Sequence, residues 1–446
     1  MGERLKEMIH DPEISVIITI HNAEKYLREC LDSVMNQTFE EIEILCMDGG
    51  STDDSPEILQ DYAAKDGRIR IINDDNTSYG HKVNEGIAQA RGEYVSVLES
   101  DDMYEPFMLE RLYEIVRRHH PDFVNGDYTN FFDVDGWRFG YVTHMYAEEN
   151  YNSLIHYREE PERFGVIPRF WTGIFRKDFL LEQDIRMNES PGASYQDMSF
   201  RFLTSILAAS AYHLNLPLYL YRTDNPGSSM HDSTKTIVIA EEHEFLQNEL
   251  RRRGITNEHV WHNAYLWKYM DFRGNLRHLK GEYRQELFER YLQELEKDRE
   301  ALKKYAKQGY GQFAREMMEE SPQRVLELLD RDVLQEQEGR ESLYRLVNAV
   351  AKLSSGQEIV IFGAGQRGRR ILELLCFEPQ CVRCIADNDG KLWDTDLGGC
   401  RILSPERAVE KYPDAVYIVA NRLHAQEMEQ QLKSMGIRES QLILWE

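Results

Sequence analysis

The chain has 446 residues, of which 41% are hydrophobic and 29% are charged, enough apolar material for two or three folded domains. This composition excludes a disordered or fibrous protein. Asp and Glu number 78 against 53 Lys and Arg, and the resulting formal charge of −25 disfavours nucleic acid and anionic lipid as partners of the whole molecule.

The first apolar run, Ile14–Ile20, is too short for a signal-peptide core or a membrane span. The six cysteines are too scattered for a disulfide framework and suit a reducing compartment. Cys381 and Cys384 form a C-x-x-C pair that either serves metal or redox chemistry or, as its apolar surroundings favour, lies in the core. We expect a cytoplasmic protein without a transmembrane segment; peripheral association with the inner membrane face is the alternative.

Strand and helix patterns alternate over the first hundred residues. The β-branched run 14–20 predicts a parallel strand buried on both faces, and Asn22 is expected to cap the helix that follows. Further strands are predicted at 42–46, 68–72 and 93–98, with helices beginning near Asp53 and spanning 82–90. This βαβαβαβ order predicts a largely parallel sheet covered by helices.

Ligands of open α/β sheets bind beyond the carboxyl ends of the strands, and those positions are polar in this chain. The most acidic is the turn Glu99-Ser100-Asp101-Asp102, where three carboxylates follow one strand. Such oxygen ligands suit Mg²⁺ or Mn²⁺ and leave coordination sites for diphosphate oxygens. Taken alone, the turn fits an acidic helix cap equally well.

Five segments, taken in their order and spacing, resemble the family-two glycosyltransferases of the GT-A fold. They are residues 15–22, 26–34, 48–53, 79–87 and 90–94, and with the acidic turn the likeness extends over at least Ser15 to Ser229. The resemblance implies an α/β enzyme that transfers a sugar, with inversion, from a nucleotide diphosphate donor. Uridine diphosphate (UDP) is the nucleotide that the family habit favours.

The resemblance also implies roles for single residues. The nucleoside pocket and diphosphate would be bound by Thr19, His21, Asn22, Asp48, Lys82, Asn84, Glu99 and Asp101, with Asp48 accepting a hydrogen bond from the base. Glu99 and Asp101 match the family's DxD motif, which clamps the metal and diphosphate. The chain departs from the pattern twice, since Glu99 replaces the first aspartate of that motif and Gly49 the second aspartate of a DDGS turn.

Sugar transfer to a hydroxyl also needs a base that takes the hydroxyl proton. Asp197 lies in a Gln-Asp segment similar to the one whose aspartate serves as the family's base, although it could instead cap the helix 198–207. Trp171 belongs to a strand that resembles the family's acceptor side, or it is plain core packing. His231 is placed where some relatives have a further diphosphate or metal contact; the alternative is a surface-loop histidine.

The rest of the chain changes in composition. We expect a glycosyltransferase domain over 1–236, amphipathic helices that serve packing or oligomerisation over 237–353, and an α/β domain over 354–446. The last domain begins with a strand and a G-x-G-x-x-G turn, and it resembles the small Rossmann-like domains of bacterial surface-polysaccharide enzymes. Candidate ligands of a nucleotide or NAD there are Gly363, Gly365, Gly368 and Asp387. A turn that serves only tight packing is the alternative.

The function expected from these features is metal-dependent transfer of a hexosyl or N-acetylhexosaminyl group, from a UDP-sugar to a saccharide or lipid-linked saccharide acceptor. Two alternatives stay open. One is an NAD-dependent sugar-nucleotide oxidoreductase or epimerase run by the C-terminal domain. The other is a non-catalytic nucleotide-sugar-binding scaffold, favoured only by Glu99 and Gly49. The helical middle region is compatible with a homodimer.

Overall fold

The computed structural model describes residues 11–163, 165, 168–228, 238–306, 320–354 and 356–445. His231 lies outside these residues. Contacts divide the chain into two units: Met1–Tyr128, Thr143–Tyr221 and Asn225–Asp330 form unit 1, and Thr129–Val142, Arg222–Asp224 and Arg331–Glu446 form unit 2. The domain boundaries expected after residues 236 and 353 stay a prediction.

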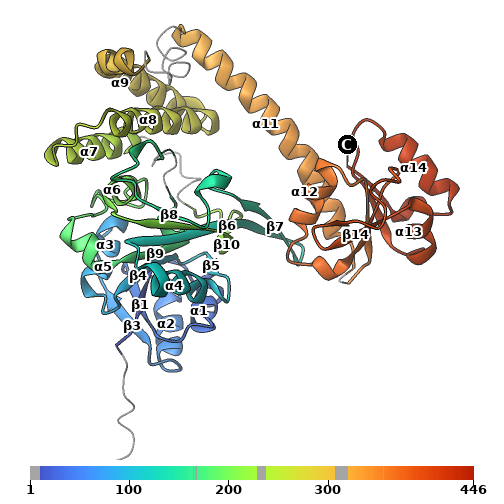
Figure 1. Cartoon of the computed structure of the whole chain (residues 1–446), viewed down its shortest axis with the longest axis horizontal. Helices are drawn as coiled ribbons and strands as arrows, with labels where there is room; N and C mark the ends of the chain where they lie inside the picture. The colour runs from blue at the N-terminus through green and yellow to red at the C-terminus, as the bar shows by residue number, and fades with distance from the viewer. Residues whose placement is uncertain are drawn as a thin grey trace, which may run out of the picture. The chain divides into compact units, whose positions relative to one another are not determined.

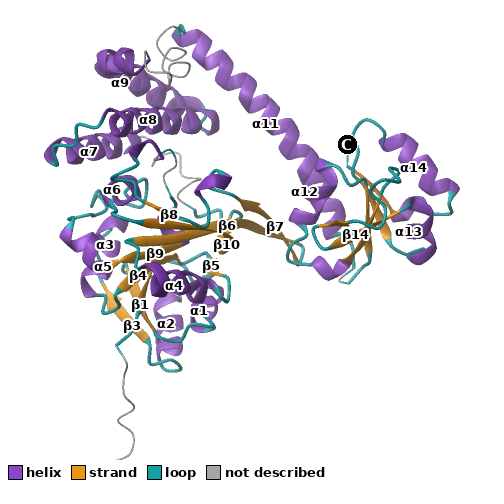
Figure 2. Cartoon of the chain, in the orientation of Figure 1, coloured by secondary structure: helices purple, strands orange, loops and turns teal. Residues whose placement is uncertain are grey.

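The centre of the first sheet is parallel, as predicted. Its strands β3 (Ile69–Asn73), β2 (Ile42–Asp48), β1 (Ile14–Ile20) and β4 (Tyr94–Glu99) lie side by side in that order (Figures 1 and 2). Every residue of β1 and β2 is buried, which explains their unbroken apolar runs. The register sets Ile20 opposite Asp48 and Thr19 opposite Glu99, so the polar residues at the strand ends come together.

The rest of this sheet contains antiparallel pairs, which the sequence pattern did not predict. Strand β9 (Gly173–Arg176) pairs antiparallel with β4, and the order continues through β6 (Phe123–Val134) and β10 (Ala211–Arg222) to β5 (Met103–Tyr104). Strand β8 (Leu154–Ile155) pairs with β10, and β7 (Trp137–Thr143) pairs with β6. The first sheet is therefore mixed.

Helices α1 to α6 connect these strands. They span Leu27–Met35, Ser55–Ala63, Tyr79–Gln89, Met108–His119, Lys177–Glu182 and Asp197–Leu207. Asn22 does not cap α1, which begins at Leu27 after Tyr26. Instead Asn22 has a φ of 52° and its side chain accepts a hydrogen bond from the Thr52 amide (2.8 Å), which ties the loop after β1 to the loop after β2.

The predicted helical middle region is confirmed. Helices α7 (Ile239–Arg252), α8 (Glu258–His278) and α9 (Gly281–Ala306) pack in succession, with α7 also lying on α6 (Figure 1). Helix α11 follows over Pro322–Ala351. No helix among the described residues is both long and apolar enough to cross a membrane.

The second sheet consists, in spatial order, of β13 (Asp396–Leu397), β14 (Cys400–Leu403), β12 (Val382–Ala386), β11 (Ile359–Phe362), β15 (Val416–Val419) and β16 (Leu442–Leu444). All neighbouring strands are parallel except the pair β13 and β14. Its helices α12 to α14 span Gln366–Leu374, Pro405–Lys411 and Ala425–Ser434. Cys381 and Cys384 are 3% and 1% exposed, so both lie in the core.

Unit 2 also contains residues that come from the first part of the chain. Trp137 and Phe139, on β7, belong to the same hydrophobic core as Leu346 and Val350 of α11. The indole of Trp137 donates a hydrogen bond to the carbonyl of Leu353 (3.3 Å). The hairpin 129–142 is thus part of the core of unit 2.

Candidate active site

The loops that follow β1 and β2 hold one another through predicted site residues. The His21 imidazole Nδ1 lies 3.0 Å from the Gly49 carbonyl oxygen, and the Asn22 amide donates to the Ser51 hydroxyl (3.0 Å). Asp48, 5% exposed, accepts hydrogen bonds from the amide (3.1 Å) and hydroxyl (2.7 Å) of Ser51. These contacts fix the position of Asp48 at the carboxyl end of β2.

The end of the Lys82 side chain lies against Gly49. The Lys82 ammonium donates to the Asn76 carbonyl oxygen (2.5 Å), and a Cβ added at Gly49 would lie only 2.7 Å from its Nζ. Lys82 is 6% exposed, and burial lowers the pKa of its ammonium. The space that an aspartate side chain would enter is therefore occupied by a cation, which offsets the charge of Asp48 and Asp74 nearby.

Glu99 is the hub of a network at the end of β4. One carboxylate oxygen accepts a hydrogen bond from the Tyr79 hydroxyl (2.5 Å) and the other from the Thr19 hydroxyl (3.3 Å). The pKa of Glu99 is raised to about 7, mainly by burial and in addition by the charges of Asp101 and Asp197. Asp197, which is distant in sequence, is thus among the charges that act on Glu99.

The other acidic residues of the turn are held by more distant partners. Asp101 accepts a hydrogen bond from the Asn225 side chain (2.7 Å), and Asp102, 1% exposed, accepts one from the Tyr219 hydroxyl (2.7 Å). Within the described ranges, no group of three or more His, Cys, Asp and Glu side chains is placed to hold a metal ion. The oxygen ligands present fit a cation bound mainly by a nucleotide diphosphate, since Mg²⁺ in such sites needs only one or two protein carboxylates.

Asp197 is the first residue of α6; the capping position itself belongs to Gln196. Its carboxylate pairs with the Arg201 guanidinium (2.9 Å), one helical turn on, and Arg201 also donates to the Pro168 carbonyl (2.9 Å). Burial lowers the pKa of Arg201. Arg201 was missed by our sequence reasoning, although its i,i+4 spacing from Asp197 is the available signal.

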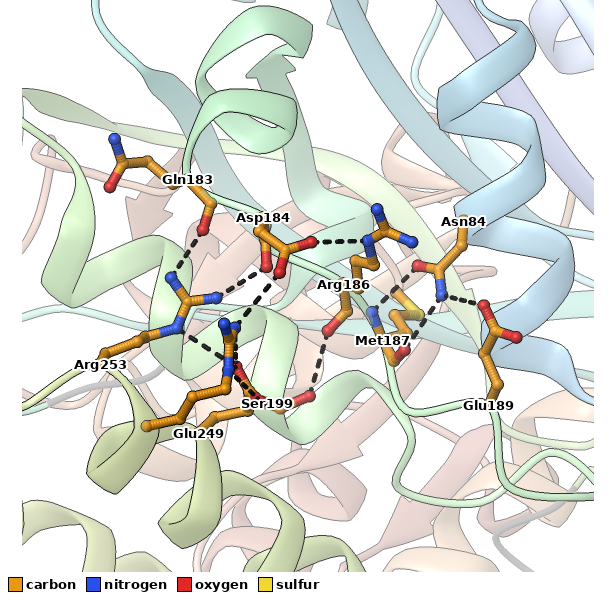
Figure 3. Close-up of polar contacts among 10 residues, drawn as sticks. Asn84, Gln183, Asp184, Arg186, Met187, Glu189, Ser199, Glu249 and Arg253 are labelled. Carbon is orange, nitrogen blue, oxygen red and sulfur yellow. Dashed lines mark hydrogen bonds and ion pairs between the residues drawn. The ribbon is translucent and has the colours of Figure 1, made fainter.

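The segment 183–196, which leads to Asp197, is fastened to α3 on one side (Figure 3). The Asn84 side chain donates to the Met187 carbonyl and accepts from the Met187 amide, both at 3.0 Å, and donates to Glu189 at 3.0 Å. Closer to the start of α3, the Tyr79 amide donates to the Gly192 carbonyl (2.8 Å). The contacts of Asn84 thus position the segment, and its predicted contact with the donor stays a prediction.

The helical region fastens the same segment from the other side. Arg253, directly after α7, donates to the carbonyls of Gln183 (2.6 Å) and Asp184 (2.7 Å), as Figure 3 shows. Glu242 of α7, only 1% exposed, accepts hydrogen bonds from the Asn188 side chain (3.0 Å) and the Ser190 hydroxyl (2.6 Å). Helices that we expected to serve packing or oligomerisation therefore also hold the segment that leads to the candidate base.

Tyr195 completes this attachment two residues before Asp197. Its φ of 61° is rare for a residue with a side chain, and its hydroxyl donates to the Asn275 side chain of α8 (2.7 Å). This long-range partner compensates for a backbone conformation that costs about 1–3 kcal/mol. Single-sequence patterns carry no signal for such a pair.

In unit 2 the glycine loop lies between β11 and α12. A Cβ at Gly368 would overlap the Gly363 carbonyl oxygen, and Gly363 has a φ of 119°, so the fold itself requires both glycines. Gly365 differs, since its φ is −76° and a Cβ there would have no neighbour within 4 Å. The Asp387 carboxylate accepts a hydrogen bond from the Ala364 amide (2.7 Å) within the loop. A nucleotide or NAD at this loop stays a prediction.

Comparison with known proteins gives two matching families. Residues 15–180 match the family described as Glycosyl transferase family 2, and residues 355–443 match the one described as C2185-like, N-terminal. Among solved structures, TarS 1-349 of S. aureus in complex with UDP is 22% identical, covers 52% of this chain and 65% of that chain, and has a TM-score of 0.39. The mannosyltransferase PcManGT of Pyrobaculum calidifontis in complex with GDP-Man and Mn²⁺ is 14% identical, covers 73% of this chain and 88% of that chain, and has a TM-score of 0.42.

Curated relatives are more informative. Glycosyltransferase GlyG of Streptococcus pneumoniae is 33% identical over 217 residues, which cover 47% of this chain and 70% of GlyG. GlyA of the same organism is 31% identical (48% of this chain, 31% of GlyA), and the putative glycosyltransferase EpsH of Bacillus subtilis is 29% identical (47% and 61%). The chain thus spans less than two thirds of GlyA and EpsH. The chain belongs to glycosyl transferase family 2, and its first sheet is that of a glycosyltransferase.

Proposed function

We propose that unit 1 transfers a sugar, with inversion, from a nucleotide diphosphate donor to a hydroxyl of a saccharide or lipid-linked saccharide. The product would belong to a surface polysaccharide or glycoconjugate assembled at the inner membrane face. One observation carries this proposal: Tyr79, the first residue of α3, donates its hydroxyl to Glu99 (2.5 Å) and its amide to Gly192 (2.8 Å), in the segment that leads to Asp197. This link between the acidic turn and the segment before Asp197 supports a shared site for the donor and the base.

In the proposed reaction, an Asp197 oxygen takes the proton of the acceptor hydroxyl. The acceptor oxygen forms a bond to the anomeric carbon as the bond from that carbon to the phosphate oxygen breaks, and the departing nucleoside diphosphate keeps the electron pair. The ion pair with Arg201 would hold the Asp197 carboxylate in one orientation. Because the acceptor oxygen attacks on the face opposite the leaving group, this single displacement gives inversion.

The donor side is proposed to use the residues at the strand ends. Asp48 would accept a hydrogen bond from the base, with Thr19, His21 and Asn22 around the nucleoside, and UDP is the nucleotide favoured by the family resemblance. A divalent cation, Mn²⁺ or Mg²⁺, bound by the carboxylates of Glu99 and Asp101 would offset charge on the diphosphate. Lys82 would add a fixed positive charge beneath Asp48.

The test is the variant Asp197→Asn. Calorimetric titration with UDP and GDP, with and without Mn²⁺, should give wild-type affinity, because the change removes the base and leaves the donor contacts. Transfer from a panel of UDP-sugars, followed by release of the nucleotide, should fall roughly 10²- to 10⁴-fold. Asp178→Asn, an exposed carboxylate of α5, is the matched control and should leave both quantities unchanged. Full activity of Asp197→Asn would remove Asp197 from the mechanism.

A further inference from the structure

Arg169 lies in a stretch of chain whose neighbouring residues contact partners of both the candidate base and the candidate donor residues. The carbonyl of Pro168, its predecessor, binds Arg201, which is the partner of Asp197. On its other side, Phe170 contacts Tyr79, the residue bonded to Glu99, with ring centroids 6.4 Å apart.

The next residue, Trp171, extends the same arrangement toward the acidic turn. Its ring stacks on Tyr221 (5.2 Å between centroids, planes at 7°) and packs against Tyr219 at 4.4 Å. Tyr219 in turn binds Asp102. The residues around Arg169, namely Pro168, Phe170 and Trp171, therefore connect to the partners of Asp197, Glu99 and Asp102.

The Arg169 side chain itself is exposed, while its carbonyl accepts a hydrogen bond from the Thr172 hydroxyl (2.8 Å). Its guanidinium makes no hydrogen bond or ion pair with any residue that the structure describes. The positive charge of Arg169 nevertheless acts on Arg201 and Tyr195 on the base side, and on Tyr221, which also experiences the charges of Asp101 and Asp102. Arg169 thus shares electrostatic neighbours with Asp197 on one side and with Asp101 and Asp102 on the other.

A site with this many carboxylates repels a diphosphate unless cations are available to bind it. The neighbouring cations are engaged: Arg201 binds Asp197 and Pro168, and Lys82 binds the Asn76 carbonyl. An arginine with its donors directed at no protein group matches the geometry of phosphate oxygens, which it binds in a bidentate manner.

We infer that Arg169 binds the diphosphate of the donor and stabilises the negative charge that grows on it as the sugar departs. This inference rests on the proposed function, because it requires a nucleotide diphosphate beside the acidic turn. It adds a residue that lies outside every motif on which the resemblance was based.

The experiment compares nucleotides with their nucleosides. UDP and GDP are titrated by calorimetry and uridine and guanosine by ligand-observed NMR, on the full chain, as wild type, Arg169→Ala and Arg169→Lys. Arg169→Ala should weaken the preferred diphosphate roughly ten- to hundredfold, as expected for loss of charge-assisted hydrogen bonds. Nucleoside affinity should not change, and Arg169→Lys should recover part of the loss. Arg118→Ala is the control, since Arg118 is an exposed arginine of α4.

Every other result would contradict the inference, and each points to a different explanation. Unchanged diphosphate affinity in Arg169→Ala would exclude the contact, and a raised KM for a phosphate-bearing acceptor in that variant would reassign the arginine to the acceptor. An equal loss for nucleoside and diphosphate would mean a structural role. If wild type binds no nucleoside diphosphate at all, the proposed function fails and the inference fails with it.

Discussion

Gly80 in the first turn of α3 offers a direct test of how the segment 183–196 is positioned. A Cβ at this residue would overlap the Asn188 carbonyl oxygen, and it would lie 3.0 Å from the Asn188 carbonyl carbon and 3.1 Å from the Met187 Cβ. Since ordinary carbon contacts lie at about 3.5–4.0 Å, the Gly80→Ala variant must push the segment away by roughly 1 Å.

The cost follows from the hydrogen bonds that cross this contact. They join Tyr79 to Gly192 (2.8 Å) and Asn84 to the amide and carbonyl of Met187 (3.0 Å each). At about 1 kcal/mol for each bond, losing them would destabilise the attachment of the segment by about 3 kcal/mol. A displacement of about 1 Å at a catalytic group lowers turnover on the order of a hundredfold, so we expect that loss of kcat in Gly80→Ala.

The assay is steady-state transfer from the UDP-sugar that wild type uses, together with the thermal unfolding midpoint. Gly274→Ala is the matched control, because Gly274 is also a helical glycine, in α8, and a Cβ there would have no neighbour within 4 Å. That control should be stabilised by up to about 1 kcal/mol, as alanine is the better helix former. Wild-type kcat in Gly80→Ala would refute the idea that the fit of the segment against α3 positions the base.

Three further predictions concern Glu99, the pair Gly49 and Lys82, and the glycine loop of unit 2. Burial raises the pKa of Glu99 from 4.5 to about 7, so between these pH values the folded chain holds a proton that the unfolded chain has released. The free energy of unfolding should therefore fall as pH rises from about 4.5 to 7. Glu99→Gln should reduce this fall, which is measured by comparing unfolding midpoints at pH 5 and pH 7.5. Gly49→Ala should destabilise wild type but cost much less in a Lys82→Ala background, which a double-mutant cycle of unfolding measures; additive effects would disprove the steric coupling. Gly368→Ala should lower the unfolding midpoint, because its Cβ would overlap the Gly363 carbonyl oxygen, whereas Gly365→Ala should not. Equal effects of the two variants would contradict this steric difference.

The parallel centre of the first sheet could be predicted because its information is local. The buried runs of β1 and β2 and the polar residues after them are visible in single segments. Asn22 shows the limit: a residue type that caps helices has its partner in Thr52, on another loop, and the helix begins without it. The order of β9, β6 and β10 in the sheet could not be predicted either, because it depends on contacts between distant residues.

The candidate site divides in the same way. Glu99, Asp101 and Asp197 were found because motifs place them at the ends of elements, and their individual roles stay predictions. Glu242 and Asn275 were not found, since a buried glutamate and an asparagine in a polar helical stretch resemble surface residues in sequence. Their contacts with the segment 183–196 exist only once α7 and α8 have packed.

The hairpin 129–142 has a consequence for how this chain could be divided or recombined. Because Trp137 and Phe139 help form the core around Leu346 and Val350, the C-terminal sheet is not a cassette that ends at one junction. Removing everything after Ser354 would take away the strand residues that share a core with Trp137 and Phe139. A gene exchange that replaced only the C-terminal portion would therefore need a new hairpin with matching aromatics, so the two stretches are expected to be inherited together.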